Sequence, residues 1–418
     1  MSIAPVRPTV LSFEDARHTV EEHAAQLTAP ATEQVDLLAA FGRVLAEPVL
    51  ADRDMPPFPR STRDGYALHS TCVSRLPAVF EVIGEIKAGE ITEKIPSRIE
   101  LGKAASIMTG APVPPGADAV VMVEHTTLDE NKVEVTRAVK PGENIVPRGA
   151  EARQGSTLLA AGTRLQEAAI ALAASAGKSS LEVYRRPQIA ILSTGDEIVG
   201  ITSKPGPTQI RNSNSYSLAV QVLRVGGQPL LLPIAPDEPV RLQQLIERGL
   251  DSNLLLMTGG VSMGRYDLVE QVLTEMGAEF FFTGALIQPG RPVVFGRCSA
   301  SVGGGQGTYF FGLPGNPIST MVTFELFARP VIEALAGQSP KKLAFVHAQL
   351  KSEIRVKSGL TRFLPAILEG EFDQATVELV PWQGSGDIAA TARSNCLAII
   401  PATREHIPPG EWVSVLIR

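Results

Sequence analysis

The chain has 418 residues, and its 38 Lys and Arg against 44 Asp and Glu leave a formal net charge of −6. At about 100–200 residues per domain, this length predicts two to four domains. Apolar residues make up 44% and charged residues 20%, a composition that supports several buried cores and excludes a disordered chain. Neither a membrane-length apolar run nor a basic block is present. We therefore expect a cytoplasmic protein that binds neither membranes nor nucleic acid.

The three cysteines (Cys72, Cys298 and Cys396) lie far apart in the sequence. This spacing suits neither a disulfide framework nor a zinc knuckle. Glycine and proline are abundant, with 37 and 32 copies, and both residues favour turns and loops. The loops are therefore the first place to look for a site.

The first part of the chain mixes helical and strand patterns. Ser12-Phe13-Glu14-Asp15 has the form of a capping box before a helix, and residues 33–46 give a second helical pattern. From about residue 51, proline and glycine separate short β-branched runs, and a helical pattern over 163–177 ends at Gly177. We predict a helical N-terminal domain in two parts, residues 1–50 and 141–184, with a β domain of residues 51–140 inserted between them.

Short buried runs alternate with helical patterns over residues 185–336. The runs are Pro187–Leu192, Pro229–Ile234, Leu254–Met257, Pro292–Phe295 and Tyr309–Phe311, and the helical patterns cover 214–225, 238–249, 267–276 and 317–335. This alternation predicts an α/β domain with a parallel, doubly wound sheet and right-handed crossovers. Residues 337–418 return to alternating runs and predict a C-terminal β domain resembling a barrel.

Three loops with glycine follow buried runs of this α/β domain. They are Ser193-Thr194-Gly195-Asp196-Glu197, Thr258-Gly259-Gly260-Val261-Ser262-Met263-Gly264 and Gly312-Leu313-Pro314-Gly315-Asn316-Pro317. Ligands of open α/β sheets bind beyond the carboxyl ends of the strands, where glycine lets backbone N–H groups approach an oxyanion. Each loop alone also fits an ordinary turn. Three of them at one predicted edge favour a ligand site.

Familiar catalytic motifs do not account for these loops. None of them is a phosphate-binding Walker loop or a Rossmann glycine motif. Gly260-Val261-Ser262-Met263-Gly264 has the spacing of a serine nucleophile elbow, but His347 and His406 lie in the predicted tail without supporting context. We therefore do not favour a serine hydrolase, and the scattered histidines disfavour a transition-metal site.

Acidic residues lie in or next to predicted loops. They are Asp64, Glu151, Glu197, Asp237 and Asp267. Carboxylates near phosphate-binding loops suit Mg²⁺, which prefers oxygen ligands, and we assign Glu197, Asp237 and Asp267 to that ion. Asp237 and Asp267 fit equally well as acids at helix N-termini, and Asp64 before Gly65 also fits an Asx turn.

Arg291 lies between Gly290 and Pro292 in a rigid turn at the sheet. A guanidinium in this position is well placed to hold an oxyanion. The alternative is a solvated arginine that closes a hairpin.

Six motifs in this order resemble those of the MoeA-type molybdopterin molybdenumtransferases, the family that includes the E domain of gephyrin. They are Ser61-Thr62-Arg63-Asp64-Gly65-Tyr66-Ala67, Met108-Thr109-Gly110-Ala111-Pro112-Val113-Pro114, Ser193-Thr194-Gly195-Asp196-Glu197, Gly259-Gly260-Val261-Ser262, Pro289-Gly290-Arg291-Pro292 and Gly312-Leu313-Pro314-Gly315-Asn316-Pro317. The likeness spans nearly the whole chain. Six motifs in order with similar spacing are highly specific, although each alone is weak.

The resemblance implies a four-domain subunit in a homodimer whose sites form between subunits, with Asp64 and Thr109 facing the partner's cleft. It implies insertion of molybdate into adenylylated molybdopterin, with release of AMP and formation of molybdenum cofactor. Mg²⁺ would assist, and the upstream adenylyltransferase and molybdoenzyme acceptors are possible partners. Catalytic roles would fall to Asp64, Thr109, Glu151, Glu197, Asp237, Asp267 and Arg291. Substrate binding would fall to Ser193, Thr194, Gly195, Gly259, Gly260, Ser262, Pro314, Gly315, Asn316, Pro317 and Ser385.

The sequence departs from the family pattern at several of these positions. Gln288 replaces a family lysine, and Arg291 occupies the second basic position. Glu151 replaces an aspartate, and Pro365 replaces a family arginine, with Arg362 nearby as a substitute. Ser385 matches a polar tail loop that would close the site. The preference between molybdate and tungstate stays open.

Two other functions compete with the transferase. One is a non-catalytic scaffold or sensor that binds molybdopterin, against which the retained acids Asp64, Glu197, Asp237 and Asp267 argue. The other is a nucleotide hydrolase built on the α/β domain. A hydrolase leaves the inserted and C-terminal β segments unexplained.

Overall fold

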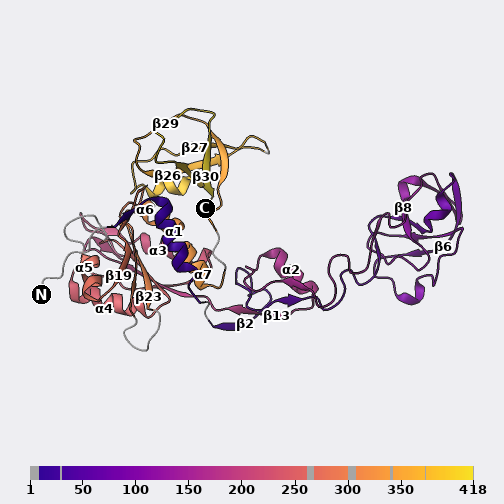
Figure 1. Ribbon diagram of the computed structural model, residues 1–418, viewed down its shortest axis with the longest axis horizontal. Helices are drawn as coiled ribbons and strands as arrows, with labels where there is room; N and C mark the ends of the chain where they lie inside the picture. Colours follow the sequence, from indigo (N-terminus) through magenta and orange to yellow (C-terminus); the bar gives the residue numbers. More distant parts are fainter. Residues whose placement is uncertain are drawn as a thin grey trace.

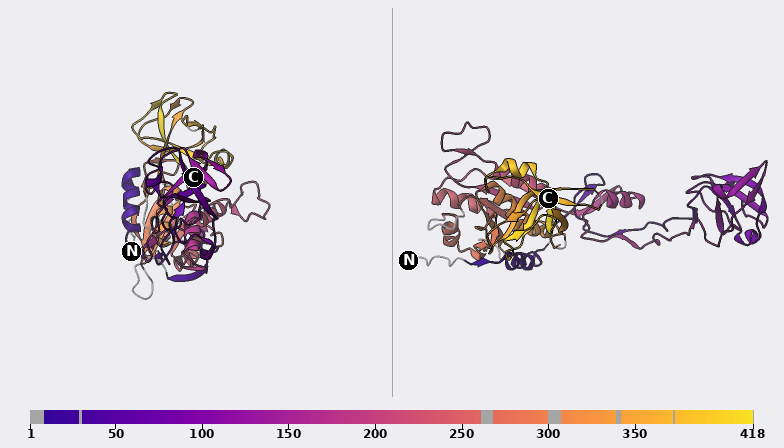
Figure 2. Two further views of the ribbon diagram at one scale, coloured as in Figure 1. Left: turned by 90° about the vertical axis from the view of Figure 1, so that its right-hand side faces the viewer. Right: turned by 90° about the horizontal axis from the view of Figure 1, so that it is seen from above.

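A computed structural model of the chain shows an elongated molecule (Figure 1). Its larger β-sheets lie in separate parts of the chain. The structure describes residues 9–28, 31–260, 268–299, 307–338, 342–371 and 373–417. Extended strands join a distal β domain to the body formed by the α/β domain and the C-terminal barrel (Figure 2). Within the described residues, no helix has both the length and the apolar character of a membrane span.

The distal domain is built on a six-stranded sheet with the order β8-β5-β7-β6-β10-β9. Its strands are β5 (Gly65–Leu68), β6 (Ala78–Ile86), β7 (Lys103–Ile107), β8 (Ala119–Met122), β9 (Thr126–Asp129) and β10 (Lys132–Val135). Successive residues of a strand face opposite sides of the sheet. Accordingly Leu68 and Val121 join one buried cluster, whereas Ala67 and Val120 join another. The predicted inserted β domain is present, with apolar packing on both of its faces.

Short antiparallel ribbons lead from the body to this distal domain. They pair β2 (Thr32–Asp36) with β13 (Ser180–Tyr184), β3 (Val49–Leu50) with β12 (Thr157–Leu159), and β4 (Arg60–Ser61) with β11 (Ile145–Val146). Next to them, α2 (Glu167–Ser175) is followed by Gly177 at φ +76°, in agreement with the predicted helix end.

The prediction of a helix over 33–46 is wrong. Residues 32–36 form β2, and turns follow it. In β2, half-buried Glu33 and Val35 alternate with exposed neighbours, and the strand pairs with residues distant in sequence. Long-range pairing of this kind overrides local helix propensity. The N-terminal domain is therefore largely a set of ribbons with one helix, not a helical domain.

The first helix, α1 (Phe13–Ala24), begins as predicted at Ser12, whose hydroxyl oxygen accepts a hydrogen bond from the Asp15 N–H at 3.0 Å. Its buried residues Ala16 and Val20 belong to the largest apolar cluster of the α/β domain. Thus α1 covers the α/β domain (Figure 1) and does not pack beside α2, contrary to the predicted two-part helical domain.

A proline explains how α1 is attached. The predicted helix 317–335 consists of α6 (Pro317–Thr323), a π-helical turn η4 (Phe324–Ala328) and α7 (Arg329–Leu335). Pro330 has no N–H, so it cannot donate to the Leu326 carbonyl oxygen four residues earlier. The buried Arg17 guanidinium of α1 donates a hydrogen bond to that oxygen instead.

The α/β domain contains a six-stranded sheet with the order β17-β14-β18-β23-β22-β19. The strands are β14 (Gln188–Ser193), β17 (Gln228–Leu231), β18 (Leu254–Thr258), β19 (Glu279–Phe282), β22 (Val294–Cys298) and β23 (Thr308–Leu313). The helices are α3 (Asn214–Arg224), α4 (Pro239–Leu250) and α5 (Leu268–Glu275). Separate apolar clusters bury α1, α3, α6 and α7 against one face and α4 and α5 against the other. The predicted doubly wound α/β fold is confirmed.

The sheet is not wholly parallel, however. β22 runs antiparallel to both β19 and β23. Only residues 299–307 separate β22 from β23, whereas a parallel crossover needs about a dozen residues or more. The short connection therefore produces a hairpin-like return at this edge of the sheet.

The C-terminal domain is a closed barrel of five strands. They are β24 (Val346–Leu350), β26 (Thr361–Glu369), β27 (Thr376–Leu379), β28 (Cys396–Ile400) and β30 (Trp412–Ile417), and the pairing of β26 with β28 closes the ring. The predicted barrel is confirmed, and its strand β26 continues through Pro365, which stands opposite Leu397 of β28. A short strand from the α/β domain, β21 (Ile287–Gln288), pairs in parallel with β26 and connects the two domains.

Replacing Gly65 by alanine is expected to disrupt the distal sheet. A Cβ atom there would lie 1.8 Å from the Val121 carbonyl oxygen on the paired strand β8. Because the obstacle is backbone, the strands must separate, and we expect a loss of about 3 kcal/mol in the free energy of unfolding. Denaturant-dependent hydrogen exchange of the β5 and β8 amides measures this change.

The matched control is Gly84→Ala in β6, where the new Cβ would meet only Pro96 Cγ at 3.8 Å. Its stability should stay within about 0.5 kcal/mol of the native value. Equal protection of the amides in the two variants would contradict the prediction.

Candidate functional site

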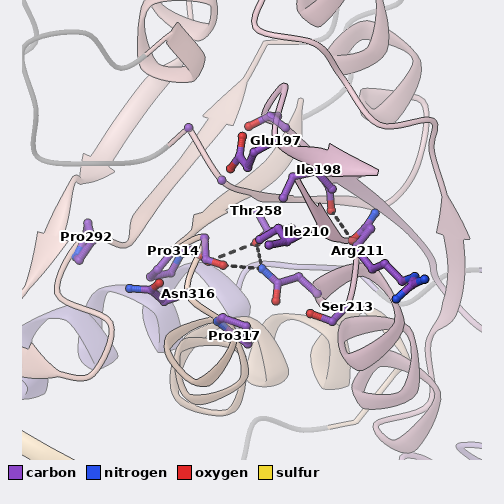
Figure 3. A pocket seen from close by; sticks show the side chains of 17 residues that line it. Glu197, Ile198, Ile210, Arg211, Ser213, Thr258, Pro292, Pro314, Asn316 and Pro317 are labelled. Carbon is purple, nitrogen blue, oxygen red and sulfur yellow. Dashed lines mark hydrogen bonds between the residues drawn. The ribbon is translucent and has the colours of Figure 1, made fainter. Parts of the chain in front are cut away.

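The three predicted loops meet at the carboxyl ends of β14, β18 and β23. Ser193 lies opposite Thr258, and Thr258 lies opposite Leu313, so the strands end at the same level. Together the loops form a cavity of about 360 Å³ (Figure 3). Nine of the predicted site residues line it: Ser193, Thr194, Glu197, Gly259, Gly260, Pro314, Gly315, Asn316 and Pro317.

Glycine is required where these loops cross. Gly259 has φ +89°, and a Cβ atom there would lie 2.5 Å from the Thr194 carbonyl oxygen. A Cβ atom on Gly315 would lie 3.6 Å from the Gly259 Cα, which shows how closely the second and third loops approach. Gly195, at φ +130°, does not line the cavity, but a side chain there would collide with the Glu197 carboxylate. The loops therefore expose backbone at the cavity wall.

One wall of the cavity was missed by the sequence reasoning. Residues 210–214, from β16 (Ile210–Arg211) to the first residue of α3, form it. Asn214 Nδ2 donates hydrogen bonds to Thr258 Oγ1 at 3.0 Å and to the Gly315 carbonyl oxygen at 2.7 Å. Asn214 thus connects the second and third loops. The available signal was an Asn-Ser-Asn sequence immediately at the predicted helix start.

Some of the buried polar atoms around this cavity are hydrogen-bonded, and others are not. The Ser193 hydroxyl donates to Asn212 Oδ1 at 3.1 Å and lies 2.8 Å from the Ser215 hydroxyl. Thr194 Oγ1 and Asn214 Oδ1 are buried without a hydrogen-bond partner among the described residues. These two oxygens therefore lack the partners that buried polar atoms normally have.

The predicted Mg²⁺ ligands are only partly brought together. Glu197 lines the cavity (Figure 3), whereas Asp237 does not, and the Asp237 N–H donates to Asp196 Oδ1 at 3.1 Å. Asp267 and Ser262 lie outside the described residues. In the part of the chain that is described, no group of three or more His, Cys, Asp or Glu residues is arranged to hold a metal ion. The Mg²⁺ assignment stays a prediction.

A second cavity, of about 440 Å³, adjoins the first and shares Pro292, Pro314 and Asn316 with it. It brings together Arg291 and Ser385, which come from the α/β domain and the barrel. Asn316 Nδ2 donates to Ser385 Oγ at 2.9 Å, and the Ile318 N–H donates to the Ser385 carbonyl oxygen at 3.0 Å. The barrel loop is therefore attached to the start of α6.

The remaining predicted residues lie on the distal domain and its ribbons. Asp64 precedes β5, Thr109 follows β7, and Glu151 follows β11. Asp64 Oδ1 accepts hydrogen bonds from the Thr109 N–H at 2.7 Å and the Thr109 hydroxyl at 2.9 Å. Glu151 Oε1 accepts one from Arg60 at 2.7 Å. Within one chain, the ribbons and the distal domain extend away from the body that contains both cavities (Figures 1 and 2).

The Thr109 N–H, and secondly the Thr109 hydroxyl, hold the pKa of Asp64 below its ordinary value. Because the pKa of Asp64 is lowered by folding, its ionised form stabilises the folded state. This stabilisation is complete above the unfolded-state pKa and is lost as the pH falls through the folded-state pKa. In Thr109→Ala we expect the Asp64 pKa to rise but to stay below its ordinary value, because the N–H remains. Carboxyl NMR titration measures it.

Asp54 is the internal control for this titration. Its pKa is lowered by the Gln154 N–H and by Arg148, neither of which Thr109 contacts. An Asp54 pKa that moves as much as that of Asp64, or an unchanged Asp64 pKa, would contradict the prediction.

Family models match three successive parts of the chain. Residues 11–177 match the MoeA N-terminal region (domain I and II), residues 190–334 match a probable molybdopterin binding domain, and residues 347–417 match the MoeA C-terminal region (domain IV). The distal domain, the residues that line the two cavities and all of the barrel strands except Val346 lie inside these matches.

Curated relatives and solved structures agree with the family models. A molybdopterin molybdenumtransferase from a Nostoc species is 36% identical over 397 residues, covering 92% of this chain and 88% of the relative. The Bacillus subtilis enzyme of that name is 33% identical, covering 92% and 90%.

Two crystal structures of a molybdopterin biosynthesis MoeA protein from Pyrococcus horikoshii also match. One has a TM-score of 0.70 and 30% identity, covering 98% of this chain and 99% of that one. The other has a TM-score of 0.76 and 26% identity, covering 98% and 100%. The resemblance seen in the motifs is thereby confirmed. The chain belongs to the MoeA family of molybdopterin molybdenumtransferases, enzymes of molybdenum cofactor biosynthesis.

Proposed function

We propose that this chain inserts molybdate into adenylylated molybdopterin and releases AMP. The observation that supports this reaction best is the pair of adjoining cavities at the strand ends. One is walled by glycine loops and polar side chains, and the other contains Arg291 and Ser385. A large substrate with a pyrophosphate and a separate small oxyanion need such a pair of compartments.

The first cavity suits the pterin and the pyrophosphate. Its glycine loops let a ligand approach backbone N–H groups closely. The start of α3, at Asn214, lies in the same wall, and a helix N-terminus favours phosphate. Thr194 and Asn214, which line the same cavity, add polar side chains to this wall.

The second cavity suits molybdate, because a guanidinium pairs well with an oxyanion. Gly290 holds the turn that carries Arg291: its φ is +105°, and a Cβ atom there would lie 2.5 Å from Thr323 Cγ2 on α6. Pro314 and Asn316 separate the two cavities. A substrate that reaches past them would bring its sulfur atoms to the oxyanion held by Arg291.

Cleavage of the pyrophosphate link is phosphoryl chemistry, in which positioning and electrostatics provide most of the catalysis. In the first cavity the loop backbone would bind and orient the phosphates, and Glu197 is the carboxylate inside it. Oxygen ligands from Glu197 and Asp237 fit Mg²⁺ in chemistry, with Asp267 as the third proposed ligand. Mg²⁺ bound there would neutralise phosphate charge.

We also propose a homodimer in which each site is completed by the distal domain of the second subunit. Asp64 and Thr109 lie beyond the extended ribbons and Glu151 lies within them, so none of the three is placed to act on either cavity of its own chain (Figure 2). A two-fold related copy would bring them to the cleft by an isologous arrangement. The upstream adenylyltransferase and the molybdoenzymes that accept the cofactor are the further partners we propose.

Arg291→Ala tests the proposed reaction. With adenylylated molybdopterin and molybdate, the native protein should release AMP and form cofactor, and the variant should be slower by about 100-fold or more. AMP release and cofactor formation are measured together. Arg241→Ala on the exposed side of α4 is the matched control and should retain native activity. A native protein that binds adenylylated molybdopterin without releasing AMP would instead be a scaffold or sensor.

Mixing two inactive variants tests the proposed dimer. Asp64→Asn damages the distal domain's contribution, and Arg291→Ala damages the cleft. In a hybrid dimer one of the two composite sites contains neither change. Random reassociation of equal amounts should therefore restore about a quarter of native activity. Activity no higher than that of the separate variants, after exchange has been verified by mass, would rule out the shared site.

A further inference from the structure

A buried arginine lies behind the second cavity. Arg362 of β26 is 6% exposed and stands opposite Gln288 of β21 in the parallel pairing of these strands. Its Nε donates a hydrogen bond to Gln288 Oε1 at 2.8 Å, and its Nη1 donates to the Leu360 carbonyl oxygen at 3.1 Å. Both residues that hold the guanidinium line the second cavity.

The charge of Arg362 has no carboxylate partner among the described residues. Its two acceptors are neutral, and no ion pair in the described part of the chain includes it. Burial alone lowers its pKa. The other buried arginines differ: Arg17 pairs with Glu21, and Arg43 pairs with Glu33. Burying a charge without a partner costs free energy, so a bound anion near Arg362 would stabilise its guanidinium.

The second cavity is the place where such an anion can bind. Its lining residues among those described include Arg291 but no carboxylate. Gln288 contributes a further group to the wall. Since Gln288 Oε1 accepts from Arg362, the amide oxygen faces the guanidinium, and the two N–H donors of Nε2 are left for another acceptor. A lysine at this position would instead place a second cation against Arg362.

We propose that Gln288 is a direct ligand of a doubly charged tetrahedral oxyanion in the second cavity. Arg362 orients the Gln288 amide, and its uncompensated charge raises the affinity of the site for that oxyanion. This inference rests on the proposed function and adds to it. Gln288 donates hydrogen bonds, and Arg362 is a positioning residue that also supplies charge. Together, the neutral amide of Gln288 and the buried guanidinium of Arg362 thus provide the hydrogen-bond donors and the positive charge that a cationic side chain at position 288 would provide.

Gln288→Glu separates this role from a structural one. The substitution keeps the size of the side chain, removes the Nε2 donors and gives Arg362 an ionic partner. We therefore expect a melting temperature equal to or above that of the native protein, together with a dissociation constant for molybdate or tungstate raised by about 10-fold or more. Calorimetric titration with each oxyanion alone measures affinity without requiring turnover.

Gln228→Glu is the matched control, because it adds the same charge at an exposed position where β17 begins. It should leave the dissociation constant within twofold of the native value. Arg362→Gln should also lose oxyanion affinity. If Arg362→Gln does not fold, the oxyanion affinity of Gln288→Glu alone tests the inference.

The outcomes distinguish this inference from the proposed function. If Gln288→Glu binds the oxyanion as tightly as the native protein does, the role of Gln288 is wrong, even when insertion activity is native. If the native protein neither binds the oxyanion nor releases AMP, the proposed function fails, and this inference fails with it. Weakened binding in Gln288→Glu at an unchanged or raised melting temperature supports the inference.

Discussion

The in-register parallel pairing of β14, β18 and β23 is the constraint on which the site depends. It makes three chain segments end at one level, so that their loops must cross within a few ångströms. Only glycine fits at the closest crossing, where Gly259 approaches the Thr194 carbonyl oxygen. Asn214 then fastens two of the loops together. Sheet register, loop composition and one amide side chain jointly produce the first cavity.

The α/β domain and its three loops were predictable because their signals are local. Buried runs, helical periodicity and glycine after a strand all lie within a few residues. The failures are non-local. The strand at 32–36 forms because residues 180–184 pair with it, and β22 turns antiparallel because its connection is short. Asn214 was missed because its importance comes from contacts with Thr258 and Gly315, which only the folded chain brings together.

The second cavity depends on an additional contact, between two domains. β21 adds to the edge of the barrel strand β26, and Ser385 hydrogen-bonds to the start of α6. Any change in how the barrel sits on the α/β domain would therefore alter the wall that holds Arg291 and Ser385. The distal domain is different, because only ribbons connect it to the body (Figure 1). This construction suits the contribution to a second subunit that we propose for the domain.

A net charge of −6 does not oppose an oxyanion site, because charges beyond about 8 Å are largely screened at physiological ionic strength. What matters is the immediate wall, where described carboxylates are absent and Arg291 is present. Position 288 carries a neutral amide there, yet the charge of Arg362 stands directly behind it. The field of a buried guanidinium held by neutral acceptors is screened less by water than that of an exposed lysine. If the second cavity binds the oxyanion as proposed, the charge of Arg362 behind Gln288 would take the place of a lysine at position 288.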